Sequence, residues 1–147
     1  MIEVYTDGSC LKNPGNGGWA FIVNNRGTIS SRSGYAIKTT NNQMELTAAI
    51  KAIEFLSDYK EMFIYTDSNY VKNGITSWII NWKKNNWVTT SRKRVKNQEL
   101  WKRLDQLNSS KKIEWKWVKA HDTNKLNNEV DFLARKSAES LTESSFN

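Results

Sequence analysis

The sequence predicts an α/β fold built on a mixed five-stranded sheet with helices on both faces. Three apolar or β-branched segments near the N-terminus have short connections between them, which is the pattern of an antiparallel meander. From residue 42 onward apolar residues recur at helical spacing, and the helices alternate with two further, parallel strands. The 147 residues suit a single domain, spanning 1–147, with one core.

The N-terminal part supplies the meander. The first strand is predicted to end on Asp7, where an apolar run gives way to a carboxylate and a glycine. Turn-rich residues 13–18 lead into a second strand at 19–23, and another turn leads into a third strand at 28–39.

A helix is predicted from residue 42, with Asn41 or Asn42 as its cap. The following elements are a strand at 62–66, a helix at 69–85, a helix at 98–107, a strand at 112–119, a helix at 125–140 and a polar tail at 141–147. In the last strand Trp115 and Trp117 share one face, so both are predicted to be core residues.

Cysteine usage and hydropathy indicate the compartment. Cys10 is the single cysteine, which excludes an internal disulfide and favours a reducing environment. No apolar run reaches the length of a membrane span, and the N-terminus enters a strand without a basic, apolar leader. We therefore expect a soluble, cytoplasmic protein with no membrane partner, and a monomer by default.

Positive charge is concentrated in one segment of the chain. The net charge is +7, yet residues 72–103 alone carry +8, because this segment contains nine basic residues and one acidic residue, Glu99. A polyanion is the natural partner of such a segment. The alternative is a solvated basic face that serves solubility alone.

Two strands end in the same way. The residues before Asp7 and before Asp67 share one pattern, an apolar run of β-branched and aromatic residues that ends on the carboxylate. If the two strands are neighbours, both carboxylates lie at one edge of the sheet, where open α/β sheets have their sites. Taken singly, each Asp is better explained as a turn or cap residue.

Three further residues are candidates for the same edge. Glu45 lies in the first turn of its helix and borders the face packed on the sheet, whereas a lone helix Glu is usually solvated. His121 follows the last strand, and Asp131 lies in the final helix. A surface His without a task and a solvated Asp are the alternative interpretations.

Four carboxylates in one cleft require cations, because like charges raise one another's pKa values. Oxygen ligands without a Cys or His cluster favour Mg²⁺, with Mn²⁺ as a substitute. Two such ions suit in-line phosphodiester hydrolysis. An acidic metal site beside a basic segment therefore indicates a nuclease.

Several spaced motifs resemble the type 1 ribonuclease H family, and its bacterial members in particular. They are YTDGSC at 5–10, TTNNQMEL at 39–46, YTDS at 65–68, and WVKAH at 117–121 followed by Asp131. The resemblance implies an endonuclease that hydrolyses the RNA strand of RNA/DNA hybrids with two Mg²⁺ ions, leaving 5′-phosphate and 3′-hydroxyl ends.

The resemblance also assigns roles. Asp7 would bridge the two ions, Asp131 would complete one site, and Glu45 with Asp67 would hold the other, while His121 would assist proton movement or product release. Substrate contacts are implied for Asn13, Asn41 and Asn42 in the minor groove, where the 2′-hydroxyl marks RNA, and for Lys38, Thr40 and Asn97 at a phosphate of the DNA strand.

Residues 75–103, the basic protrusion, resemble the substrate grip of bacterial members. Its expected contacts are Trp78, Lys83, Lys84 and Trp101. Core packing is the favoured role for at least two of the tryptophans Trp78, Trp82, Trp87 and Trp101, because aromatics at helical spacing usually pack inward. Contact with DNA sugars or bases is the alternative for those that remain exposed.

The sequence departs from the family pattern at three positions. Ala120 replaces a common Gly, Asn128 replaces a common acidic residue, and Lys38 replaces a common Arg. Two other function classes stay open at this point. One is a non-catalytic binder of hybrid or double-stranded RNA, and the other is a two-metal nuclease or strand-transfer enzyme acting on duplex DNA.

Overall fold

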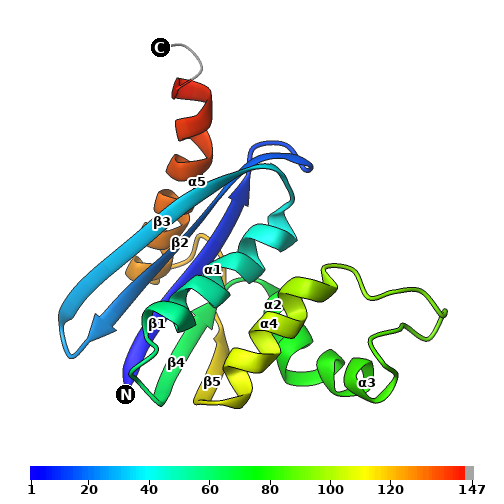
Figure 1. Cartoon of the computed structure of the whole chain (residues 1–147). Helices are drawn as coiled ribbons and strands as arrows, with labels where there is room; N and C mark the ends of the chain where they lie inside the picture. Colours follow the sequence, from blue (N-terminus) through cyan, green and yellow to red (C-terminus); the bar gives the residue numbers. More distant parts are fainter. Residues whose placement is uncertain (145–147) are drawn as a thin grey trace.

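The computed structural model describes residues 1–144, and their side chains through residue 140. A sheet in the order β3-β2-β1-β4-β5 forms its centre (Figure 1). The strands are β1 (Ile2–Cys10), β2 (Gly15–Asn25), β3 (Thr28–Thr39), β4 (Glu61–Thr66) and β5 (Lys112–Trp117). The first three strands pair antiparallel, whereas β4 joins β1 and β5 joins β4 in parallel, which confirms the predicted mixed sheet.

Helices cover both faces of this sheet (Figure 1). The helices α1 (Asn41–Phe55) and α4 (Gln98–Ser109) enclose the larger core, which includes fully buried Leu46, Ile64 and Trp101. The helix α5 (Lys125–Ser144) closes a smaller core on the opposite face. None of the helices in residues 1–144 has the length and apolar character needed to cross a membrane.

The second strand begins earlier than predicted, at Gly15, because residues 15–18 pair with β3 and, from Gly17 onward, also with β1. A Cβ on Gly18 would collide with the backbone of Ala134 and Ala138 in α5. Gly18 is therefore a strand residue that lets the helix approach the sheet, although its neighbours have the composition of a turn.

The helical region after β4 is continuous but contains a π-helical turn. It consists of α2 (Asn69–Asn73), a π-helical turn η1 (Gly74–Trp78) and α3 (Ile79–Lys84), which confirms the helix predicted at 69–85 and adds a wider turn in its middle. The ring of Trp101 lies where a Cβ of Gly74 would be, and the widened turn accommodates that close packing.

The C-terminal limits also differ from the prediction. The last helix continues to Ser144, so the polar tail expected at 141–147 is helical over its first four residues, and the rest of it lies outside the described residues. Strand β5 ends at Trp117 rather than at Lys119.

The two tryptophans of β5 have different surroundings. Trp115 is 8% exposed, as predicted, whereas Trp117 is 45% exposed, so its placement in the core is wrong. Trp115 reaches α4 through a hydrogen bond to Asn108, but Trp117 lies at the end of the strand, opposite the last residue of β4.

Candidate active site

Parallel pairing of β1 and β4 brings two carboxylates together. Tyr5 lies opposite Tyr65 and Thr6 opposite Thr66, so Asp7 and Asp67 follow at the same edge of the sheet. The two strands do not end alike, because β1 continues to Cys10 along its antiparallel partner β2. Asp7 thus belongs to a strand interior, and only Asp67 follows a strand end as predicted.

Glu45 enters the site because α1 packs directly on β1. A Cβ on Gly8 would collide with the backbone of Met44 and Glu45, so only glycine allows this approach. The backbone N–H of Gly8 donates a short hydrogen bond to Glu45 Oε1. The helix begins after Thr40, whose hydroxyl accepts a hydrogen bond from Gln43 N and caps it in place of the predicted Asn41 or Asn42.

Carboxylate oxygens of Asp7, Glu45 and Asp67 lie within 4.8 Å of one another. Asp7 is 3% exposed. Burial, followed by the charges of Glu45 and Asp67 and a contact with Asp131, raises the pKa of Asp7 from 3.8 to about 12. Burial and the charge of Asp67 raise the pKa of Glu45 well above its ordinary value.

Asp131 and His121 adjoin this cluster from α5 and the loop before it. Asp131 contacts Asp7, and its Oδ2 lies 4.0 Å from Nδ1 of His121. The His121 side chain is 75% exposed, and its φ of 56° is left-handed. Arg135 donates a hydrogen bond to Asp131 at 3.3 Å, one helical turn on. We call Asp7, Glu45, Asp67 and Asp131 the acidic centre.

The donor set of the acidic centre fits a hard divalent cation. Its side chains offer carboxylate oxygens, which Mg²⁺ and Mn²⁺ prefer. Protonation is the other way to relieve repulsion among crowded carboxylates, and the pKa values of Asp7 and Glu45 are raised first by burial and then by the neighbouring carboxylates. A bound cation relieves the repulsion while the carboxylates stay ionised.

Polar residues from two loops meet at the start of α1. The side chain of Asn13, in the β1–β2 connection, accepts a hydrogen bond from the backbone of Asn41 at 3.3 Å. Asn13, Asn41 and Asn42 are exposed, and Thr40 is half-buried. The structure therefore gathers these four predicted substrate residues beside Glu45.

Asn97 is tied to the same region. Its Oδ1 accepts a hydrogen bond from Gln43 Nε2 at 3.2 Å, and its Nδ2 donates to the hydroxyl of Tyr70 at 3.1 Å. Lys38 is exposed one residue before the end of β3, with a left-handed φ of 50°. Beside Asn97 lies a surface hollow of about 450 Å³, lined by Gln43, Arg94, Val95, Lys96, Asn97, Gln98, Glu99 and Leu100.

The basic protrusion consists of η1, α3, the loop after it and the first half of α4, and the loop extends away from the sheet (Figure 1). Lys84 is exposed, and Lys83 forms an exposed ion pair with Asp105 at 3.2 Å. Trp78 is 39% exposed, but Trp101 is completely buried and donates a hydrogen bond to Tyr70. That burial contradicts a nucleic-acid contact by Trp101.

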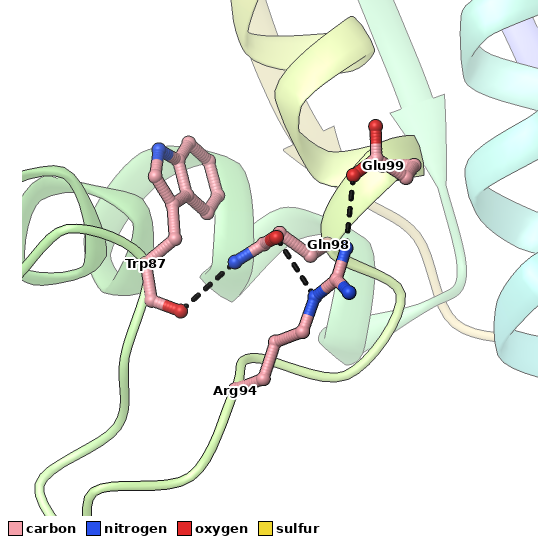
Figure 2. Close-up of polar contacts among 4 residues, drawn as sticks. All are labelled: Trp87, Arg94, Gln98 and Glu99. Atoms are coloured by element: carbon pink, nitrogen blue, oxygen red, sulfur yellow. Dashed lines mark hydrogen bonds and ion pairs between the residues drawn. The ribbon is translucent and has the colours of Figure 1, made fainter.

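Core packing is thus confirmed for Trp101, and Trp82 and Trp87 pack partly buried against the same core. Polar contacts fasten the loop to α4 (Figure 2). Gln98 Nε2 donates to the carbonyl oxygen of Trp87, Arg94 Nε donates to Gln98 Oε1, and the Arg94 guanidinium pairs with Glu99.

The sequence interpretation missed two residues that organise the site. Gln43 joins α1 to Asn97, and its signal is the capping-box spacing from Thr40 to Gln43. Arg135 offsets part of the charge of Asp131, and its signal is the i, i+4 spacing on a helix.

Sequence comparisons agree with this architecture. A sequence model of the RNase H family matches residues 1–139. Ribonuclease H of Treponema denticola is 49% identical over 150 residues, covering 90% of this chain and 94% of that protein. Ribonuclease H of Wolbachia pipientis wMel is 52% identical over 135 residues, covering 92% and 93%. Ribonuclease H of Escherichia coli O139:H28 is 49% identical over 138 residues, covering 94% and 89%.

Solved structures agree as well. LC9-RNase H1, a type 1 RNase H with the type 2 active-site motif, has a TM-score of 0.83 at 29% identity, covering 95% of this chain and 72% of that one. RNase H1 from the archaeon Halobacterium salinarum NRC-1 shares the fold, with a TM-score of 0.72 at 21% identity over 95% of this chain and 98% of that one. Motifs, acidic centre, relatives and fold lead to one conclusion: the chain belongs to the RNase H family.

Proposed function

We propose that the chain hydrolyses the RNA strand of RNA/DNA hybrids with the help of two divalent cations and leaves 5′-phosphate and 3′-hydroxyl ends. The observation that carries this proposal is the convergence of four carboxylates around buried Asp7. Membership of the RNase H family supports the reaction class.

Mg²⁺ is the expected cation, with Mn²⁺ as a substitute. Asp7 would bridge two ions, Asp131 would complete one site, and Glu45 with Asp67 would hold the other. Bound there, the ions would activate water and stabilise the leaving oxygen of the phosphodiester. The Gly8 backbone fixes Glu45 for this task, and Arg135 fixes Asp131.

His121 is proposed to carry a proton to or from the reacting phosphate, or to help the product leave. Its exposed ring lies near Asp131, so it can reach both solvent and the acidic centre. Ala120 precedes it in place of glycine, which makes the loop stiffer than one with glycine there.

Substrate recognition is assigned to the polar residues beside Glu45. Asn13, Asn41 and Asn42 would contact the minor groove, where a 2′-hydroxyl distinguishes RNA from DNA. Lys38, Thr40 and Asn97 would hold a phosphate of the DNA strand, and Lys38 would act there as a point charge. The hydrogen bond from Gln43 to Asn97 ties the start of α1 to Asn97, and so holds the minor-groove residues at a fixed distance from the phosphate-binding residues.

The basic protrusion is proposed as the grip of this single domain on the hybrid. Lys83 and Lys84 would neutralise phosphates, and the exposed part of Trp78 would pack on the nucleic acid. Trp101 supports the protrusion from beneath through its bond to Tyr70.

The test uses one labelled RNA strand, presented alone, in RNA/RNA and in a hybrid with DNA, each with Mg²⁺, Mn²⁺ or EDTA. Metal-dependent cutting of the hybrid alone, with products that carry a 5′-phosphate, is the expected result. A hybrid that is bound but left intact with both metals would favour the non-catalytic binder. A labelled DNA duplex is tested under the same conditions, and its cleavage would favour the strand-transfer class.

A further inference from the structure

The pairing of β4 with β5 stops just before a member of the acidic centre. Thr66 lies opposite Trp117, and the last backbone bond of this ladder runs from Val118 N to Thr66 O at 2.9 Å. Asp67 follows Thr66 and lies beyond the paired strands. Its main chain therefore needs support of another kind if the carboxylate is to keep its place.

The indole of Trp117 supplies that support. Its Nε1 donates a hydrogen bond to the backbone carbonyl oxygen of Asp67 at 3.1 Å. The Trp117 side chain thus adds one hydrogen bond after the last backbone bond between β4 and β5, and it does so at Asp67 of the acidic centre. The ring is 45% exposed, so core packing does not account for a tryptophan at this position.

The other neighbours of Asp67 are also fixed. Ser68 N donates to the hydroxyl of Thr66 at 3.0 Å, and the Ser68 hydroxyl caps α2 by accepting a hydrogen bond from Val71 N at 3.1 Å. These bonds hold the main chain on either side of Asp67. The bond from Trp117 holds the carbonyl group of Asp67 itself.

Trp115 offers a natural comparison, because it lies two residues earlier on the same strand. Its Nε1 also donates a hydrogen bond, at 3.0 Å, but the acceptor is Asn108 of α4, and the ring is buried. One tryptophan therefore joins β5 to a helix, whereas the other joins β5 to the acidic centre.

We propose that Trp117 is a positioning residue: its indole N–H holds the backbone of Asp67 so that the carboxylate stays aligned with Asp7 and Glu45. The inference rests on the proposed function for its effect on catalysis. Its effect on cation binding rests only on the donor set of the acidic centre.

The experiment compares Trp117→Phe with the matched control Trp115→Phe. A third protein carries 3-benzothienylalanine at position 117, which keeps the shape of the ring and lacks the N–H. For each protein, kcat and KM are measured on the hybrid, the Kd for Mn²⁺ is measured by calorimetry without substrate, and Tm is measured by calorimetric scanning.

We expect both changes at position 117 to lower kcat about tenfold, since small misplacements of catalytic groups are costly, with KM within about twofold. The Kd for Mn²⁺ should rise about threefold or more, because Asp67 is less well fixed. Trp115→Phe should lower Tm yet leave kcat and the Kd for Mn²⁺ within about twofold of the parent, since its partner lies in α4.

Unchanged kcat and Mn²⁺ affinity in both position-117 proteins, beside an active parent, would overturn the inference. A raised KM with unchanged kcat would also overturn it, because the ring would then act by touching substrate. If the parent itself leaves hybrids uncut, the proposed function fails, and the Mn²⁺ affinities still decide the role of Trp117.

Discussion

The acidic centre and the basic protrusion carry opposite charges, and the molecule holds them in different ways. Two strands and two helices fix the acidic centre, and its central residue, Asp7, is almost completely buried. The loop of the protrusion is fastened by surface contacts, among them the Arg94–Glu99 pair, whose side chains are 68% and 79% exposed. Exposed pairs of this kind contribute little stability. The acidic centre is thus built into the core, while the loop of the protrusion depends on weak contacts in solvent.

The largest expected effect comes from the acidic centre. Asp7→Asn keeps the shape of the side chain but removes the charge that would bridge the cations. We expect kcat on hybrids to fall on the order of a thousandfold, because metal ions supply several kcal/mol of transition-state stabilisation. The measurement is single-turnover cleavage with Mg²⁺, and the matched control is Asp58→Asn, which changes an exposed carboxylate outside the acidic centre. Near-parental activity of Asp7→Asn would refute the mechanism.

Neutralising the protrusion should act on binding rather than on chemistry. Replacing Lys83, Lys84, Arg92, Lys93, Arg94 and Lys96 by glutamine removes charges that would contact phosphates. We expect KM at moderate salt to rise at least about tenfold and its salt dependence to become shallower, with kcat within about threefold. Replacing two lysines outside the protrusion by glutamine, Lys60 just before β4 and Lys112 at the start of β5, is the control. An unchanged KM would mean that the protrusion is not the grip.

A third prediction concerns stability without metal. Asp7 is protonated in the folded chain over a pH range in which it is ionised in the unfolded chain, because its pKa rises from 3.8 to about 12. The folded state therefore binds more protons, and the free energy of unfolding should decrease as pH rises above about 4, by up to about 1.4 kcal/mol per pH unit.

Denaturant unfolding in EDTA from about pH 5 to about pH 9 tests this sign. The free energy of unfolding of Asp7→Asn should fall less than that of the parent over that pH range. In the parent, Mn²⁺ should reduce the fall between low and high pH, because it binds the ionised carboxylates. If the unfolding free energies of the two proteins in EDTA change with pH in parallel, burial of Asp7 does not control the pH dependence of stability.

The smallest expected effect concerns the contacts that fasten the loop. Gln98→Ala removes the bonds to the Trp87 carbonyl and to Arg94 (Figure 2). We expect KM to rise about threefold, since two modest hydrogen bonds order the loop, with Tm nearly unchanged. Gln106→Ala, which removes a contact to Arg103 on the same helix, is the control. Faster amide exchange at Val95, whose N–H bonds to Trp87, would report the loosened loop directly.

Much of the fold follows from local pattern. The meander, the alternation of helices and strands and the shared edge of Asp7 and Asp67 could be predicted, because short connections and apolar periods are visible in the chain. The prediction that β1 ends at Asp7 was wrong, because pairing with β2 extends the strand, and pairing is not a local property.

Other differences arise from close contacts between distant segments. At the π turn, Gly74 leaves room for the ring of Trp101, and the early start of β2 comes from its pairing with β1 and β3. Trp117 has the spacing of a core residue, but it is the last residue of β5 and is 45% exposed. No periodicity along the sequence carries that information.

The contact at Gly8 limits how this chain can be improved in the laboratory. Replacing glycine by alanine often stabilises a protein by restricting its unfolded chain. At position 8 the added methyl group would strike the backbone of α1 and displace Glu45. Gly27 has open space around it, but its φ of +92° penalises any side chain. A search for hardier variants should therefore leave both glycines unchanged, the first for lack of room and the second for its backbone.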